Sequence, residues 1–561
     1  MTRVLHVGAE IYPFVKTGGL ADVLGALPAA LAAAGNDARV LLPGLPALKK
    51  VLRERREVAE VTPPWGGPAV RLVEGRLDAP SLAAVPALLL EHDGLYARAG
   101  TPYGDGAGHA FADNPRRFAL LGLAATRLAE GVHAAWRPQI LHAHDWHAGL
   151  VPAYNAFARA GGTSRAASVF TIHNLAFQGV FARSAFDELG LPAQAFGVQG
   201  VEFHGQWSFM KAALHYADRI TTVSPTYAQE IRTPELGAGL DGLLRERAAA
   251  VSGILNGVDD AVWDPAHDGA IAARFHAARM SGKAECKAAL QRECGIDVQD
   301  TAPLFTAVSR LTEQKGFNLV TEAVDALVAR GGQLVVLGSG DASLEAALRA
   351  AATKHPRHVA LRQGYDEALS HRIFAGSDVT LVPSRFEPCG LTQMYALRYG
   401  SLPLVRRTGG LADTVVDCTL EDLADERATG FVFERFEVED LLRAVRRAFT
   451  LWSQPKAWRT VRQRAMAQRF GWGKAAERYA ALYEDAATQA ARHAAAAHDQ
   501  RRGLFTHAVG AAAVHRWSGA EGRRCGGQRH RRRADRHGGE RAVGARPEVP
   551  DHALTLSSAC R

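Results

Sequence analysis

Two cations stand close together in a segment that reads as a loop. Residues 309–316 are SRLTEQKG, which places Arg310 and Lys315 five residues apart. The segment follows a predicted strand, so both side chains can face a ligand beyond the strand's carboxyl end. Two positive charges there can grip a diphosphate and stabilise it as it leaves a substrate. Alone, two surface cations would mean little. Gly338, in the sequence GSGD after the next strand, adds a weak signal for a nucleotide loop.

A carboxylate precedes a glycine between another predicted strand and helix. Residues 387–392 read EPCGLT. The N-terminus of a helix offers free N–H groups and the positive end of its dipole to an anion. Glu387 can hold sugar hydroxyls there, while Gly390 allows the backbone to approach closely. Taken alone the segment would more simply be a helix cap, but the paired cations of the same half favour a ligand site.

Histidines gather in the first half of the chain. Residues 142–147 read HAHDWH, a spacing that suits neither HExxH nor a zinc finger, so we predict no metal site. Asp145 can accept hydrogen bonds from sugar hydroxyls and Trp146 can stack on a sugar ring. His173 follows another predicted strand, where a lone histidine is more often structural than catalytic.

The composition is that of a globular protein whose 561 residues suffice for two domains or more, with 47% hydrophobic and 22% charged residues. The N-terminus begins as a strand and carries no export signal, and no apolar run is long enough to cross a bilayer. The six cysteines are scattered without a CxxC pair, which argues against a disulfide framework. We therefore expect a cytoplasmic protein without a membrane partner.

The net charge of +8 belongs to the end of the chain. Residues 486–561 hold 14 arginines against six acidic residues, so the rest of the chain is neutral. Such a composition favours disorder, and we predict a disordered arginine-rich tail. Nucleic-acid binding through it is the alternative, but we expect no nucleic-acid partner.

Two series of alternating strands and helices position the candidate residues. The first series has predicted strands at 3–9, 38–42, 140–143 and 168–172 and a helix at 21–34. The second has predicted strands at 304–308, 334–337, 359–362, 379–382 and 402–405, with helices at 318–329, 343–354, 367–375 and 391–399. Short apolar strands between helices indicate parallel sheets covered on both faces. We predict an α/β protein with an N-terminal domain at 1–259, a linking region at 260–302 and a C-terminal domain at 303–485.

The two series share one sequence. Residues 16–22 read KTGGLAD and residues 407–413 read RTGGLAD. Ligands in open α/β sheets bind outside the carboxyl ends of the strands, where we place both loops. Two such sheets facing each other would enclose a cleft between them. Chance similarity of two turn sequences is the simpler alternative.

In order along about 480 residues, eight segments resemble the bacterial glycogen synthase and plant starch synthase family, which are retaining glycosyltransferases of the GT-B fold. The matching segments are 16–22, 142–149, 171–174, 217–227, 254–259, 309–316, 383–393 and 406–413. The resemblance implies two Rossmann-like domains facing each other across a cleft, with the last helix packing back toward the first domain. It ends near residue 484, so the tail has no counterpart in the family.

The resemblance also implies roles for individual residues. It implies a catalytic set of His173, Arg310, Lys315 and Glu387. It implies that the donor is bound by Lys16, Gly18, Gly19, Asn256, Gly338, Tyr365, Cys389, Gly390, Leu391, Thr392, Thr408, Gly409 and Gly410. It implies that the acceptor and sugar side is lined by Glu10, Asp22, Tyr96 and Asp145.

The implied reaction is transfer of glucose from ADP-glucose to the non-reducing end of an α-1,4-glucan, with retention of configuration and release of ADP. It needs no metal and no pyridoxal phosphate. Another GT-B enzyme, such as a phosphorylase or a sucrose-type glucosyltransferase, is one alternative, and a catalytically silent glucan-binding protein is another. The intact catalytic set favours an enzyme. The sequence does not distinguish adenine from uracil in the donor, and it does not predict an oligomeric state.

Overall fold

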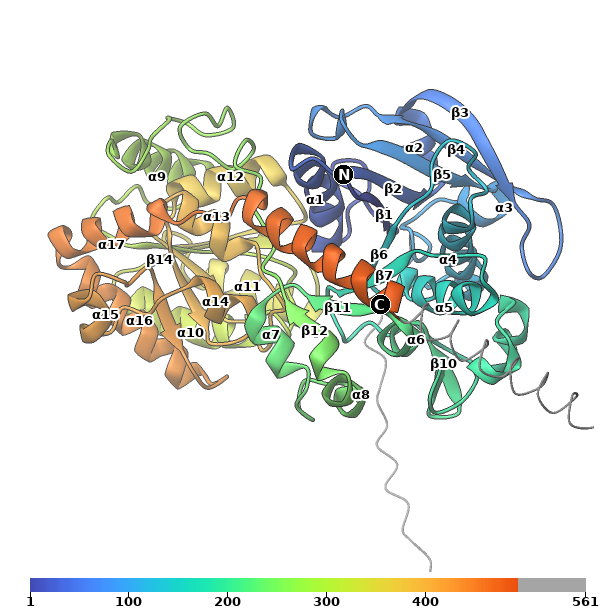
Figure 1. The fold of residues 1–561 in the computed structure, drawn as a ribbon. Helices are drawn as coiled ribbons and strands as arrows, with labels where there is room; N and C mark the ends of the chain where they lie inside the picture. The colour runs from blue at the N-terminus through green and yellow to red at the C-terminus, as the bar shows by residue number, and fades with distance from the viewer. Residues whose placement is uncertain (493–561) are drawn as a thin grey trace, which may run out of the picture.

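Two α/β domains make up the computed structural model, which describes residues 1–492 (Figure 1). The sheet of the N-terminal domain has nine strands in the order β12-β11-β7-β6-β1-β2-β5-β4-β3. These strands are β1 (Arg3–Val7), β2 (Asp37–Pro43), β3 (Leu52–Val61), β4 (Val70–Leu77), β5 (Pro86–Glu91), β6 (Ile140–His144), β7 (Ala167–Ile172), β11 (Arg219–Thr222) and β12 (Val251–Gly253). The pairs β5–β4 and β4–β3 are antiparallel, and the other pairs of this sheet are parallel.

Helices cover this sheet, so most of its strands are buried and composed largely of apolar residues. They are α1 (Gly19–Ala33), α2 (Pro46–Val51), α3 (Asp93–Tyr96), α4 (Asn114–Glu130), α5 (Val151–Gly161), α6 (Phe209–Tyr216), α7 (Pro225–Glu230) and α8 (Asp241–Glu246). All residues of β6 and β7 are buried, as expected for a parallel sheet packed on both faces. A small antiparallel sheet of β8 (Val180–Phe181), β9 (Glu202–Phe203) and β10 (Gln206–Ser208) lies at the edge of this domain.

The C-terminal domain has a six-stranded parallel sheet in the order β15-β14-β13-β16-β17-β18. Its strands are β13 (Leu304–Val308), β14 (Gln333–Gly338), β15 (Val359–Gln363), β16 (Val379–Val382), β17 (Leu402–Arg406) and β18 (Phe431–Phe433). Its helices are α9 (Ser281–Cys294), α10 (Phe317–Ala329), α11 (Ala342–Lys354), α12 (Glu367–Gly376), α13 (Thr392–Arg398), α14 (Gly409–Thr414), α15 (Leu420–Ala424), α16 (Val438–Trp452) and α17 (Pro455–Ala467). The predicted doubly wound α/β class is confirmed.

The segment 260–302 is more than a connection between domains. It contains α9, which packs against α12 of the C-terminal domain. Leu290 of α9 and Ile296 after it share a buried cluster with Leu304 of β13 and Ile373 of α12. The apolar side chains of α9 need a covering surface, and the C-terminal sheet layer provides it. Structurally, the segment from α9 onward belongs to the C-terminal domain.

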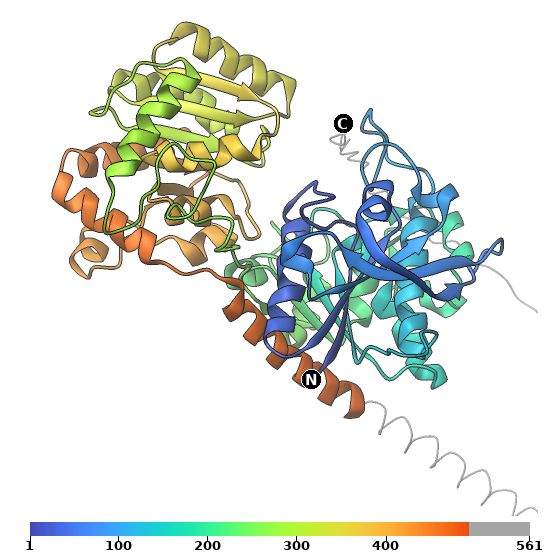
Figure 2. The ribbon, with the colours of Figure 1, turned by 90° about the horizontal axis from the view of Figure 1, so that it is seen from above.

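The chain crosses between the domains twice, and the two crossings run side by side. The backbone N–H of Val258 donates to the carbonyl of Phe470 at 2.7 Å. The ring of Trp472 covers Gly257, where an added Cβ would lie 2.7 Å from the ring. Figure 2 shows the second crossing leading into the final helix.

That final helix, residues 472–492, lies along the N-terminal domain (Figures 1 and 2). Tyr479 and Tyr483 are fully buried, and they join α1 residues such as Leu27 in one apolar cluster. The helix runs past residue 486, where we placed the start of the tail. The rest of that predicted tail lies outside the described residues. None of the helices in residues 1–492 combines the length and apolar character that a bilayer crossing requires.

Candidate active site

A cavity of about 1190 Å³ lies between the two domains, at the carboxyl ends of the central strands. It brings together most of the residues singled out from the sequence. From the N-terminal domain it is lined by Glu10, Lys16, Gly18, Gly19, Asp22, Asp145, His173 and Asn256. From the C-terminal domain it is lined by Arg310, Lys315, Gly338, Tyr365, Glu387, Cys389, Gly390, Leu391 and Thr392.

An ion pair stands at the C-terminal wall of the cavity. Lys315, in the loop after β13, donates to the Oε2 atom of Glu387 at 2.6 Å. The Ser384 hydroxyl donates to the same oxygen at 3.0 Å. Glu387 is 5% exposed, so both contacts offset the cost of burying its charge. Its other oxygen, Oε1, has no hydrogen-bond partner within residues 1–492.

Arg310 comes from the same loop and is exposed. In the part of the chain that the structure describes, its guanidinium has no ion-pair partner. The loop is held in place by its backbone, because the N–H of Leu311 donates to the carbonyl of Ser339 at 2.9 Å. Gly338 permits this approach, since a Cβ there would lie 1.9 Å from the carbonyl oxygen of Ser309. An unpaired cation beside an open cavity can bind an anionic ligand.

Glu10 holds the first glycine-rich loop against the cavity. Its carboxylate accepts hydrogen bonds from the backbone N–H and the hydroxyl of Thr17, both at 2.5 Å, and from the N–H of Gly18 at 3.3 Å. Lys16 at the start of this loop pairs with Asp22 of α1 at 2.9 Å. Burial raises the pKa of Asp22, and the ammonium of Lys16 opposes that rise.

Asp145 and His173 form the opposite wall. Asp145 is buried with a backbone φ of 61°, a left-handed conformation that is uncommon outside glycine. Burial raises the pKa of its carboxyl to about 8, although hydrogen bonds from the backbone N–H groups of Asn174 and His173 act to lower it. The group is therefore largely protonated at neutral pH. Burial lowers the pKa of His173 to about 3, so this imidazole is neutral.

Asn256 and Cys389 complete the floor between the domains. Asn256 is 6% exposed, and its Oδ1 atom lacks a hydrogen-bond partner among the described residues. Burial raises the pKa of the Cys389 thiol to about 12, so this thiol remains protonated and is a poor nucleophile. Buried polar atoms without partners are uncommon, so the unpartnered oxygen of Asn256 is notable at the edge of the cavity that this residue lines.

Tyr96 does not reach the cavity. Its side chain is 1% exposed, and its hydroxyl donates to the backbone carbonyl of Arg117 at 2.7 Å. Tyr103, which we did not single out, lines the cavity instead and donates a hydrogen bond to Glu10. The two tyrosines are close in sequence, and only the path of the chain between α3 and α4 decides which one lines the cavity.

The second TGGLAD segment also lies outside the cavity lining. Thr408 and the N–H of Gly409 donate to Glu230 of α7 in the other domain, at 2.9 and 3.0 Å. Gly410 donates to the carbonyl of Glu387 at 3.1 Å. A Cβ on Gly409 would lie 1.9 Å from that same carbonyl oxygen. Gly409 and Gly410 thus pack against the 387–390 turn, and residues 408–410 are not among those that line the cavity.

Sequence reasoning also missed a contact that joins the domains beside the cavity. The hydroxyl of Tyr12, in the N-terminal domain, donates to Oε1 of Glu367 at 2.8 Å. Tyr365, which is 73% exposed, donates to Oε2 of the same carboxylate. Lys16 lies 5.2 Å from the centre of the Tyr12 ring and 6.0 Å from that of Tyr365. No local pattern around Tyr12 signals a partner more than 350 residues away.

Among solved structures, the chain is similar to the catalytic domain of starch synthase IV from Arabidopsis thaliana bound to ADP and acarbose. The match has a TM-score of 0.77 and 32% sequence identity, and it covers 87% of this chain and 99% of the other. Two facing Rossmann-like domains with this cavity between them define a glycosyltransferase of the GT-B class.

Sequence comparisons name the family. Residues 3–246 match the model of the starch synthase catalytic domain, and residues 295–464 match that of the group 1 glycosyl transferases. Glycogen synthase of Variovorax paradoxus is 57% identical over 488 residues, and that of Serratia proteamaculans is 53% identical over 484. Each match covers 86% of this chain and 99% of the relative. The chain belongs to the glycogen synthase and starch synthase family, and its activity is glucosyl transfer in glycogen synthesis.

Proposed function

We propose that the donor is ADP-glucose and that the acceptor is the non-reducing end of an α-1,4-glucan, with retention of configuration and release of ADP. The observation that carries the proposal is the grouping of Arg310, Lys315 and Glu387 on one wall of the cavity. The related starch synthase IV, which was solved with ADP and acarbose, supports the choice of donor and acceptor.

The C-terminal wall suits the leaving diphosphate. Arg310 is unpaired within the described residues, and Lys315 has one carboxylate partner. When the bond between glucose and phosphate breaks, negative charge grows on the phosphate, and both cations stabilise it. Lys16 faces the same cavity from the other domain and adds a third positive charge. In this proposal the C-terminal domain holds the nucleotide and Tyr365 stacks on its base.

The sugar lies between the diphosphate and the N-terminal wall. Oε1 of Glu387 accepts a hydrogen bond from a glucose hydroxyl, since Oε2 is already occupied by Lys315 and Ser384. Cys389 and Gly390 bring their backbone against the sugar. Asp145 and His173 face it from the N-terminal domain and contact the acceptor side. This arrangement asks the protein mainly to position the reactants and to stabilise the departing charge.

The acceptor oxygen then attacks from the face that the phosphate leaves, and the phosphate takes its proton. Water in the cavity would compete with the acceptor for the donor. The contact from Tyr12 to Glu367 holds the domains together across the cavity edge and limits that access. We therefore propose that the contact between Tyr12 and Glu367 is present when the two domains are arranged for catalysis.

We also propose that the protein works in the cytoplasm. Cys286, Cys294, Cys389 and Cys418 are all free and buried thiols. Free thiols fit a reducing compartment, and export normally favours disulfides.

The test offers ADP-glucose and UDP-glucose in parallel, with glycogen as acceptor, and measures the released diphosphate with and without EDTA. We expect turnover with ADP-glucose to exceed that with UDP-glucose and to be insensitive to EDTA. Equal turnover of both donors would reject the donor assignment. Binding of glycogen without any release of diphosphate would reject catalysis and favour a glucan-binding protein.

A further inference from the structure

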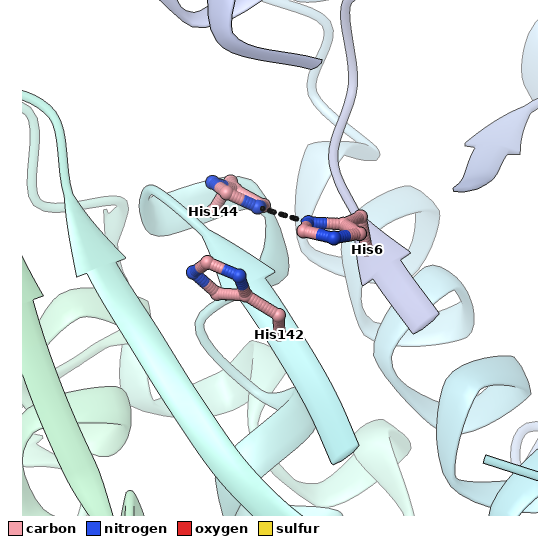
Figure 3. Close-up of side chains that lie close together, drawn as sticks. All are labelled: His6, His142 and His144. Carbon is pink, nitrogen blue, oxygen red and sulfur yellow. Dashed lines mark hydrogen bonds between the residues drawn. The ribbon is translucent and has the colours of Figure 1, made fainter. Parts of the chain in front are cut away.

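Three buried histidines lie behind the cavity wall. His6 projects from β1, and His142 and His144 project from β6 (Figure 3). His6 is paired in register with His142, and side chains two residues apart share one face of a strand, so all three meet on the same face of the sheet. His144 pairs in register with Thr171 of β7, which places His173 next along the same face.

Two hydrogen bonds connect these side chains into a chain that ends at the cavity. Nδ1 of His6 lies 3.1 Å from Nε2 of His144, the bond drawn in Figure 3. Nδ1 of His144 in turn lies 3.1 Å from Nε2 of His173. His6 and His144 are fully buried, and His173 lines the cavity.

A metal ion is the obvious alternative for three clustered histidines, whose nitrogens lie within 4.8 Å of one another. The hydrogen bonds of His142 argue against it. Its Nδ1 bonds to the hydroxyl of Tyr483 at 2.8 Å and its Nε2 to that of Thr171 at 2.7 Å. Both nitrogens of His142 and both nitrogens of His144 are thus engaged, and each would have to give up a hydrogen bond to bind a metal.

The chain of hydrogen bonds has a preferred direction. Burial lowers the pKa of His6, His144 and His173, so each ring is neutral and carries one N–H and one acceptor nitrogen. The protons can therefore all sit on Nδ1 or all on Nε2. Nε2 of His6 has no partner among the described residues. An unpaired buried donor is rarer in proteins than an unpaired acceptor, which favours the proton on Nδ1.

We propose that His6 and His144 are positioning residues that fix His173 in the tautomer with its proton on Nδ1. His6 donates to His144, and His144 donates to Nε2 of His173. Nε2 of His173 is then occupied as an acceptor, and Nδ1 presents an N–H to a sugar oxygen in the cavity. The use of that N–H rests on the proposed function, but the tautomer does not.

The first test measures the tautomer of His173 directly in the parent protein. Protein labelled with 15N-histidine is studied by two-bond 1H–15N correlation spectra, and the His173 signals are assigned by their loss in His173→Asn. We expect His173 to show a protonated Nδ1 and an unprotonated Nε2. A protonated Nε2 would overturn the proposal whatever the enzyme's activity. One equivalent of metal in the purified protein, removed by EDTA with a change in these signals, would overturn it as well.

The second test compares two substitutions of the first histidine. His6→Leu removes the donor at the buried end, while His6→Asn keeps an N–H at the position of Nδ1. We expect kcat of His6→Leu to fall about fivefold to tenfold, because the hydrogen bond that favours the Nδ1-protonated tautomer of His173 is lost. We expect kcat of His6→Asn to stay within about threefold of the parent, with the His173 tautomer retained.

His142→Leu is the matched control. It removes two hydrogen bonds at the same depth without interrupting the chain to His173. It should lower the melting temperature but leave the His173 tautomer and the kcat of the folded enzyme unchanged. If His6→Asn lost as much activity as His6→Leu, or if His142→Leu changed the tautomer, the positioning role would be rejected. Should His6→Leu fail to fold, the spectra of the parent and of His6→Asn still decide the matter.

Discussion

Replacing Lys315 by alanine should slow turnover by about two orders of magnitude and also destabilise the fold. The ammonium lies 2.6 Å from Glu387, and its side chain is 18% exposed, so water screens it only partly. One unit charge about 4 Å from another contributes about 4 kcal/mol at an effective dielectric constant of about 20. Loss of one preorganised donor to a developing charge typically costs about 2.7–4 kcal/mol. Because Arg310 and Lys16 remain, we expect the lower end, a fall in kcat of about 100-fold.

The charge on the leaving diphosphate grows in the transition state, so the loss should appear in kcat more than in KM. Removing Lys315 also deprives Glu387 of its ion-pair partner, and a buried carboxylate that loses a hydrogen bond costs about 1–3 kcal/mol of stability. Steady-state release of ADP from ADP-glucose with glycogen measures the first effect, and thermal unfolding measures the second.

Lys354→Ala is the control for this substitution. Lys354 also pairs with a carboxylate, Asp325, at 2.6 Å, but both side chains are 62% exposed. Exposed pairs of this kind contribute about 0–1 kcal/mol, so neither kcat nor the melting temperature should change appreciably. A fall in kcat of less than about threefold for Lys315→Ala would show that this cation does not face the departing charge.

Two further predictions follow from the geometry. Gly409→Ala should lower kcat by at least about tenfold although residue 409 is outside the cavity, because its Cβ would displace the carbonyl of Glu387. Gly473→Ala is the control, because a Cβ at residue 473 meets no atom within 4 Å. Equal activity of the two variants would contradict the prediction. Asp145 keeps a proton in the folded protein that the unfolded chain releases, so its contribution to stability falls as the pH rises from about 4 to about 8. The melting temperature of Asp145→Asn relative to the parent should therefore rise across that range, and parallel curves would show that Asp145 does not titrate as described.

Much of the C-terminal domain could be predicted because its signals are local. The strands Leu304–Val308 and Val379–Val382 have the predicted bounds, since each is a short apolar run between polar residues. Such runs become buried parallel strands wherever helices flank them. The cations of the 309–316 loop could be placed for the same reason, because a loop that follows a parallel strand opens at the ligand-binding edge of its sheet.

What local sequence could not show are the contacts between distant segments. Tyr96 and Tyr103 are both plausible ligand residues by type, and the side chain that reaches Glu10 is decided by the turns between them. The region 260–302 was predicted only to link the two domains. Its helix α9 packs against α12, so its membership in the C-terminal domain depends on a contact with a distant segment.

The sequence by itself determined which segments are helices or strands, their order, and the residue types available for chemistry. These follow from the local spacing of apolar residues and from the residues that form turns. Tertiary structure decided which of them share a cavity. The two TGGLAD segments show the difference. The first lines the cavity and is hydrogen-bonded to Glu10, whereas the second is hydrogen-bonded to the backbone of the turn at Glu387. The two loops share a local sequence but contact different residues. Hydrogen bonds and steric contacts with those residues determine what each loop can bind.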